Sequence, residues 1–142
     1  MPNIEDPNVH YFPISVPSPY SWKVHRELID RMLSARELTA VVIQAGCSGA
    51  IPSRKFDQQP FSSWLPKLAR TVPVFVIPDA PQPQRYPWRS SMWNAEIGCI
   101  NLETAYSGIA DEVVAKIIDV FKNTPDKYEA VRLICDIFKQ QD

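Results

Sequence analysis

The order of apolar and polar positions predicts strands that alternate with helices. The segment 38–46, LTAVVIQAG, is apolar on consecutive positions and rich in β-branched residues, which indicates a strand buried on both faces. The segment 72–79, VPVFVIPD, has the same character, and its prolines limit the strand at 73 and 78. A third strand is predicted within 95–102, AEIGCINL. Consecutive apolar positions of this kind are typical of parallel sheets covered by helices.

Apolar residues at helical spacing predict two helices in the first half of the chain. The first helix is expected to follow Ser18 as N-cap and Pro19 as first helical residue, and to end near Arg36. The second is expected to begin at Ser63, because Pro66 then lies in the first turn, where no intrahelical N–H is needed. The two apolar stripes are Val24, Leu28, Ile29, Met32 and Leu33, and Phe61, Trp64, Leu65 and Leu68.

Two further helices are predicted at the end of the chain. One follows Ser107 as N-cap and ends at Asn123, and the other follows Thr124, with Pro125 at its first position and Asp126 in its first turn. The short connection predicts an antiparallel pair. The expected apolar positions are Ile109, Val113, Val114, Ile117, Ile118 and Phe121 in the first helix, and Val131, Ile134 and Phe138 in the second, flanked by Tyr128, Leu133 and Ile137.

Proline content adds an extended arm to this picture. The chain has 14 prolines and only four glycines, and the prolines of residues 1–17 predict an extended arm in which Val9–Val16 forms an edge strand. The predicted fold is therefore one α/β domain over 1–142. It has a three- to four-stranded, mainly parallel sheet flanked by helices, a C-terminal antiparallel helix pair and a proline-rich N-terminal arm.

Charge and composition narrow the function classes. A net charge of −1 and a pI near 6.1 argue against a general nucleic-acid or membrane-surface binder. The apolar runs are far shorter than the roughly 20 residues that span a bilayer, and Met1 precedes an acidic segment without a hydrophobic leader, so we expect a cytoplasmic protein. The three cysteines show no metal-ligand spacing and are expected to be reduced, and we expect no metal and no cofactor.

The segment GCSGAIPSR, residues 46–54, is a weak candidate for chemistry. Its strand, cysteine and arginine resemble the phosphate loop of cysteine-dependent phosphatases, in which five residues separate the two side chains. Here six residues separate Cys47 from Arg54, Pro52 removes one amide donor, and no helix begins directly afterwards. A structural turn with a small, partly buried cysteine is favoured over a nucleophile, and a non-covalent ligand loop remains as a third reading.

Asp79 and the two histidines are further weak candidates. Asp79 ends a predicted strand, where an acidic residue can meet a ribose hydroxyl or a metal, but Asp before Ala-Pro is also a common turn former. Glu96 lacks the lysine that a nuclease motif would place two positions later. His10 and His25 have no metal-type neighbour three or four positions away, so packed or surface histidines are expected.

The segment 79–94 is the strongest functional feature of the sequence. A connection of this length without periodicity is uncommon in a compact domain and is usually functional or disordered. Aromatic, methionine and arginine side chains, which are enriched in interface cores, alternate there: Arg85, Tyr86, Trp88, Arg89, Met92 and Trp93. The same mixture can stack single-stranded bases, which the net charge disfavours, or fold back onto the sheet.

Two functions are consistent with these features. The favoured one is a non-enzymatic interaction protein that binds a partner macromolecule, a protein in preference to nucleic acid, or its own copy, through the 79–94 loop, alone or together with the proline-rich arm. The alternative is a small enzyme or ligand-binding domain whose pocket combines residues 46–54, Asp79 and the 85–93 segment. Common nucleotide-binding and hydrolase motifs are absent, so an enzyme is the less favoured of the two.

Overall fold

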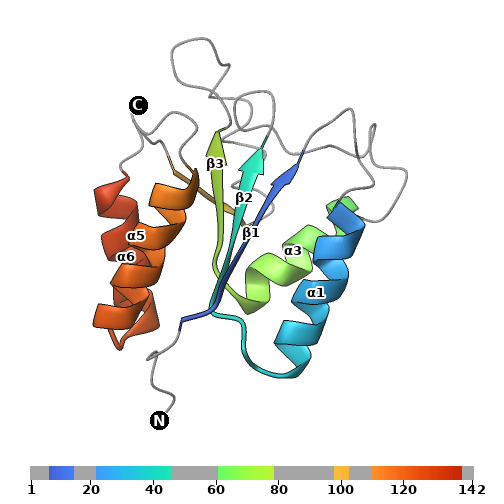
Figure 1. Ribbon diagram of the computed structural model, residues 1–142, viewed down its shortest axis with the longest axis horizontal. Coiled ribbons are helices and arrows are strands. Elements are labelled where there is room, and N and C mark those ends of the chain that lie inside the picture. Colours follow the sequence, from blue (N-terminus) through green and yellow to red (C-terminus); the bar gives the residue numbers. More distant parts are fainter. Residues whose placement is uncertain (1–6, 15–21, 46–60, 79–97, 103–109, 139–142) are drawn as a thin grey trace.

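The protein folds as an α/β domain around a parallel sheet (Figure 1). The computed structural model describes residues 7–14, 22–45, 61–78, 98–102 and 110–138. Its strands are β1 (Val9–Ile14), β2 (Ala40–Ala45), β3 (Val74–Pro78) and the two-residue β4 (Ile100–Asn101). They lie in the order β1-β2-β3-β4, and every neighbouring pair is parallel. The predicted parallel sheet is confirmed, with β1 at one edge.

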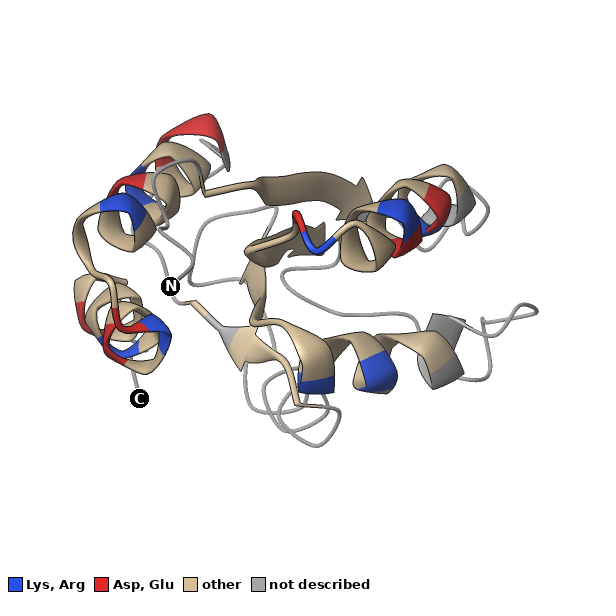
Figure 2. Ribbon diagram, turned by 90° about the horizontal axis from the view of Figure 1, so that it is seen from below, with Lys and Arg blue, Asp and Glu red and all other residues tan. Residues whose placement is uncertain are grey.

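Four helices of the described segments cover the two faces of this sheet. They are α1 (Trp22–Ser34), α3 (Phe61–Thr71), α5 (Ala110–Asn123) and α6 (Lys127–Ile137). In Figure 1, α1 and α3 lie on one side of the strands, and α5 and α6 lie side by side on the other. The described strands carry no Lys, Arg, Asp or Glu, so the charged side chains of the described residues lie on helices and connections (Figure 2).

Successive side chains of each strand point to opposite faces of the sheet, and this divides the core into two halves. Val41 and Ile43 of β2 face α1 and α3, whereas Ala40 and Val42 face α5 and α6, and all four are fully buried. This explains the consecutive apolar positions, because each strand residue meets a helix whichever way it points. The first half also contains Phe12, Ile29, Trp64, Leu65, Leu68, Val74 and Val76, and the second contains Phe75, Ile77, Val113, Ile117, Phe121, Ala130 and Ile134.

The strand register determines which groups lie on the outer edge of β1. The Val41 N–H donates to the carbonyl of Pro73 at 3.0 Å. The backbone N–H and C=O groups of odd-numbered β2 residues therefore point towards β3, and those of even-numbered residues point towards β1. With Val9 opposite Ala40, the odd-numbered backbone groups of β1 then point outwards. Pro13, an exposed odd-numbered residue, therefore has its missing N–H on the open edge, where a proline is tolerated.

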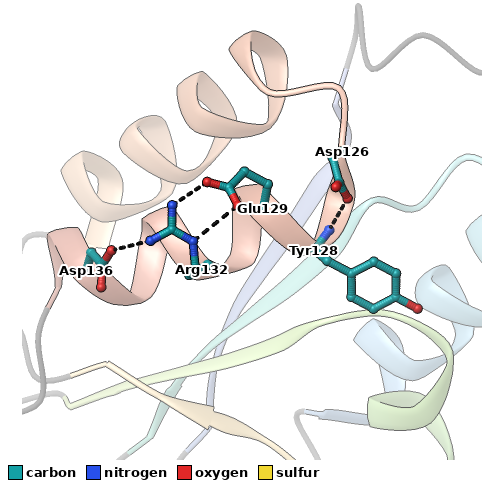
Figure 3. A network of polar contacts seen from close by, with 5 residues as sticks. All are labelled: Asp126, Tyr128, Glu129, Arg132 and Asp136. Atoms are coloured by element: carbon teal, nitrogen blue, oxygen red, sulfur yellow. Dashed lines mark hydrogen bonds and ion pairs between the residues drawn. The ribbon is translucent and has the colours of Figure 1, made fainter.

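The predicted N-caps Ser18 and Ser107 lie outside the described residues, and the two helix starts that can be compared differ from the prediction. Helix α3 begins at Phe61 rather than Ser63, so Pro66 lies inside it. The proline removes one bond, that to the carbonyl of Ser62, and burial of Trp64, Leu65 and Leu68 outweighs that loss. Helix α6 begins at Lys127, and its N-cap is Asp126 rather than Thr124. The Asp126 carboxylate accepts a hydrogen bond from the Tyr128 N–H at 3.0 Å (Figure 3).

Some predicted apolar faces are narrower than expected. Tyr128 is 88% exposed and Ile137 is also exposed, while Ala130, which the pattern missed, is fully buried in α6. In α1, Ile29 is buried, but Val24 is 62% exposed. The predicted strand 95–102 is reduced to β4 within the described residues. Residues 1–6 and 15–17 of the predicted arm lie outside the described residues.

Candidate functional site

The strands end in register at one edge of the sheet, here called the carboxyl edge. Ile14 is opposite Ala45, and Ala45 is opposite Pro78. Neighbouring strands lie roughly 4.8 Å apart, so the chain leaves the sheet at adjacent points after each of these residues. In open α/β sheets, ligands bind outside this edge.

The sequence-predicted site residues follow these strand ends. Gly46 and Asp79 come directly after the paired residues Ala45 and Pro78. The weak catalytic candidates Cys47, Arg54 and Asp79 lie outside the described residues, as does Glu96. So do the binding candidates Arg85, Tyr86, Trp88, Arg89, Met92 and Trp93 of the 79–94 loop.

The two cysteines within the described residues are unsuited to nucleophilic chemistry. Cys99 is buried in the core, and burial raises the pKa of its thiol to about 12. Cys135 is half-buried, and burial, reinforced by the negative charge of Asp136, also raises its pKa. Both thiols are therefore protonated at neutral pH and free of disulfides. Cys47 is the one cysteine whose environment these observations do not cover.

A histidine pair joins the edge strand to the first helix. His10 of β1 and His25 of α1 form a hydrogen bond between Nε2 and Nδ1 at 3.0 Å. The Phe12 ring stacks on His25, with ring centroids 4.8 Å apart and planes 13° from parallel. Sequence reasoning missed this pair because the histidines are 15 positions apart, and a local spacing rule cannot detect such a contact.

The pair is electrically neutral at pH 7. Burial lowers the pKa of His10, and the neighbouring His25 lowers it further; burial also lowers the pKa of His25. One neutral ring donates and the other accepts, which double protonation would prevent. Among the described residues, no group of three or more His, Cys, Asp or Glu side chains gathers to hold a metal. The pair therefore acts as a polar contact between β1 and α1.

A hollow of about 310 Å³ opens at the opposite, amino edge of the sheet. It lies where α3 ends, β3 and β4 begin, and α6 starts, the edge towards the viewer in Figure 2. Val72, Ile100 and Val131 provide an apolar lining, and Arg70, Lys127 and Tyr128 provide polar groups. This amino-edge hollow was not predicted, because its lining comes from three segments that carry no common motif.

The two positively charged side chains that line the hollow, Arg70 and Lys127, differ in their pairing from Arg132, the other cation of α6. Arg132 bonds to Glu129 and, at 3.1 Å, to Asp136 (Figure 3). Over the described segments, neither Arg70 nor Lys127 has a side-chain hydrogen bond or ion pair. Partial burial lowers the pKa of Lys127, since its charged form loses hydration. An anion in the hollow would meet two positive charges that have no partner within the described part of the chain.

Comparison with known proteins gives no family for this chain. No family model matches it, and no curated protein matches its sequence. No helix within the described segments is both long and apolar enough to cross a membrane.

Proposed function

We propose that the protein binds a partner protein, or a second copy of itself, through the 79–94 loop. The observation that carries this proposal is the register of Ala45 and Pro78, which brings the chain out of β3 beside the exit from β2. The loop therefore begins at the edge where open α/β domains bind their ligands. It follows a strand whose Val74, Phe75, Val76 and Ile77 are buried, which provides a rigid base.

The composition of the loop supports a macromolecular partner. Tyr86, Trp88 and Trp93 can bury large areas with few rotatable bonds, and Arg85 and Arg89 can form charge-assisted hydrogen bonds. Such residues account for most of the binding energy in protein interfaces. A net charge of −1 favours a protein over single-stranded nucleic acid, which requires a basic surface.

Photo-crosslinking tests this proposal directly. A photoreactive benzoylphenylalanine at position 88 is expected to crosslink the partner, and the same group at the exposed position 137 of α6 is not. Sedimentation equilibrium then distinguishes a second copy from a different protein. The double variant W88A/W93A is expected to reduce binding at least about a hundredfold, because loss of an aromatic anchor typically costs about 2 kcal/mol or more.

A matched variant separates binding from folding. V24A/I137A removes exposed apolar side chains elsewhere and is expected to leave binding unchanged. W88A/W93A should unfold within a few degrees of the original protein. A large fall in its melting temperature would identify the tryptophans as core residues and contradict the proposal.

The same strand register supports a second candidate, a small enzyme or ligand-binding domain at the carboxyl edge. Its pocket would combine residues 46–54, Asp79 and the 85–93 segment, since they follow the neighbouring strands β2 and β3. The enzymatic form requires Cys47 to be a thiolate at neutral pH.

The other two cysteines make this candidate easy to test. Because the pKa values of Cys99 and Cys135 are raised, their alkylation by iodoacetamide should be slow at pH 7, and Cys47 can be followed separately by mass spectrometry. A Cys47 pKa below about 7 would support the nucleophile. An ordinary value near 8.5 would exclude it while leaving ligand binding to be tested by titration.

A further inference from the structure

We propose that the amino-edge hollow binds a small organic anion, with its acidic group between Arg70 and Lys127 and its apolar body against Ile100 and Val131. This site lies at the opposite edge of the sheet from the 79–94 loop and is independent of the function proposed above. The ligand class follows from the size, charge and lining of the hollow.

The volume suits a small molecule. At about 310 Å³ the hollow lies at the lower end of the range for ligand pockets, roughly 300–1,000 Å³. Such pockets combine a mainly apolar lining with a few polar groups that orient the ligand. Val72, Ile100 and Val131 meet the first condition, and Arg70, Lys127 and Tyr128 meet the second. The capacity corresponds to a ligand of about one ring with its acidic substituent.

The charges specify an acidic group. Arg70 and Lys127 line the same hollow, and neither is paired within the described segments. Asp126 accepts the Tyr128 N–H and Glu129 pairs with Arg132, and neither carboxylate forms an ion pair with Arg70 or Lys127 (Figure 3). Lys127 also lies in the first turn of α6, at the positive end of the helix dipole, where an anion is preferred. A carboxylate or phosphate would compensate Lys127 for the hydration that it loses on burial.

Tyr128 supplies an aromatic surface next to these charges. Its side chain is 88% exposed although its backbone N–H is held by the cap, so the ring projects from the start of α6 (Figure 3). An exposed tyrosine can contact an apolar or aromatic body and direct its hydroxyl towards water. The hollow therefore provides separate contacts for the acidic end and for the body of an organic anion.

Nuclear magnetic resonance titration tests the site with defined probes. Phenyl phosphate, benzoate and hexanoate provide organic anions, inorganic phosphate provides the charge alone, and phenol provides the body alone. At least one organic anion is expected to shift the amide signals of Ile100, Lys127 and Val131 in a saturable way. Its affinity should exceed that of phosphate and of phenol by about tenfold or more, because both parts of the ligand are in contact.

Variants in which two positive side chains are replaced by glutamine provide the test and its control. R70Q/K127Q should weaken the best organic anion about tenfold or more, whereas R31Q/K122Q, with the same change in net charge, should not. Neither variant is expected to lower the melting temperature appreciably, since none of these four side chains forms a hydrogen bond or ion pair within the described residues. Absence of saturable shifts with all three organic anions, equal binding of inorganic phosphate, or equal losses in the two variants would overturn the proposal.

Discussion

The histidine pair shows how two ordinary residues acquire a joint property. His10 and His25 occupy different elements, yet their ring nitrogens are 3.0 Å apart, and Phe12 shields one face of His25. Each ring lies in an environment that lowers its pKa, mainly because burial disfavours the charged form. The contact between β1 and α1 is therefore sensitive to acid.

Acidification from pH 7 towards pH 5 is expected to destabilise the fold through this pair. Above the unfolded histidine pKa, near 6.5, both states are neutral and the stabilising contact is intact. As the pH falls below that value, the unfolded chain takes up protons more readily than the folded one, so the free energy of unfolding decreases. Urea unfolding at several pH values measures this slope.

The chain offers a clean control for that measurement. It has only two histidines, so H10Q/H25Q contains none, and its stability should change less between pH 7 and pH 5 than that of the original protein. Carboxylates contribute equally to the pH dependence of both proteins, so their contribution cancels when the two slopes are compared. Identical slopes would mean that the lowered pKa values do not govern acid stability.

At the scale of single elements, the capping of α6 determines where the last helix begins. Thr124 and Pro125 match a common helix-start pattern, but the Asp126 carboxylate reaches the Tyr128 N–H and defines the start instead. Both residue types are good caps, so the sequence alone cannot choose between them. The choice depends on which backbone N–H groups the packed helix leaves free.

Replacement of the true cap should be measurable. D126A is expected to lower the free energy of unfolding by about 1 kcal/mol, because the Tyr128 N–H loses its acceptor. T124A provides the matched control and should change it by less than about 0.5 kcal/mol. Urea unfolding of both variants measures these losses. A larger loss in T124A than in D126A would show that the helix is capped by Thr124.

These elements also show what the sequence can and cannot predict. Buried strands and amphipathic helices are local patterns, and β2, β3 and α5 follow them because each residue's burial repeats with the period of its own element. Contacts between distant segments have no such period. The histidine pair and the amino-edge hollow, which combines α3, β4 and α6, therefore became visible only in the folded chain.

At the scale of the whole molecule, the outer edge of β1, which no described strand covers, influences whether the protein associates with itself. An edge strand presents unpaired backbone groups that can pair with another chain. Val9 and Tyr11 direct their backbone groups outwards, but Pro13, on the same side, has no N–H to offer. The proline thus interrupts the edge while leaving the bonds to β2 intact.

Replacing Pro13 should increase pairing of the β1 edge with a second molecule. P13V restores the missing donor and raises the β-propensity, so concentration-dependent dimers are expected in sedimentation velocity runs where the original protein shows less association. P125A, which alters a proline in the turn before α6, is the control and should not promote dimers. Equal behaviour of the two variants would show that Pro13 does not protect the edge.

The two-sided sheet also has a consequence during synthesis. The strands β1, β2 and β3 and the helices α1 and α3 are synthesised before α5 and α6. Until then, the face formed by Ala40, Val42, Phe75 and Ile77 lacks the helices that bury it. A nascent chain that ends before residue 110 therefore lacks the helices that cover this apolar face, and such a face is the kind that chaperones bind. The tendency to aggregate through this face is expected to fall only after α6 has been synthesised.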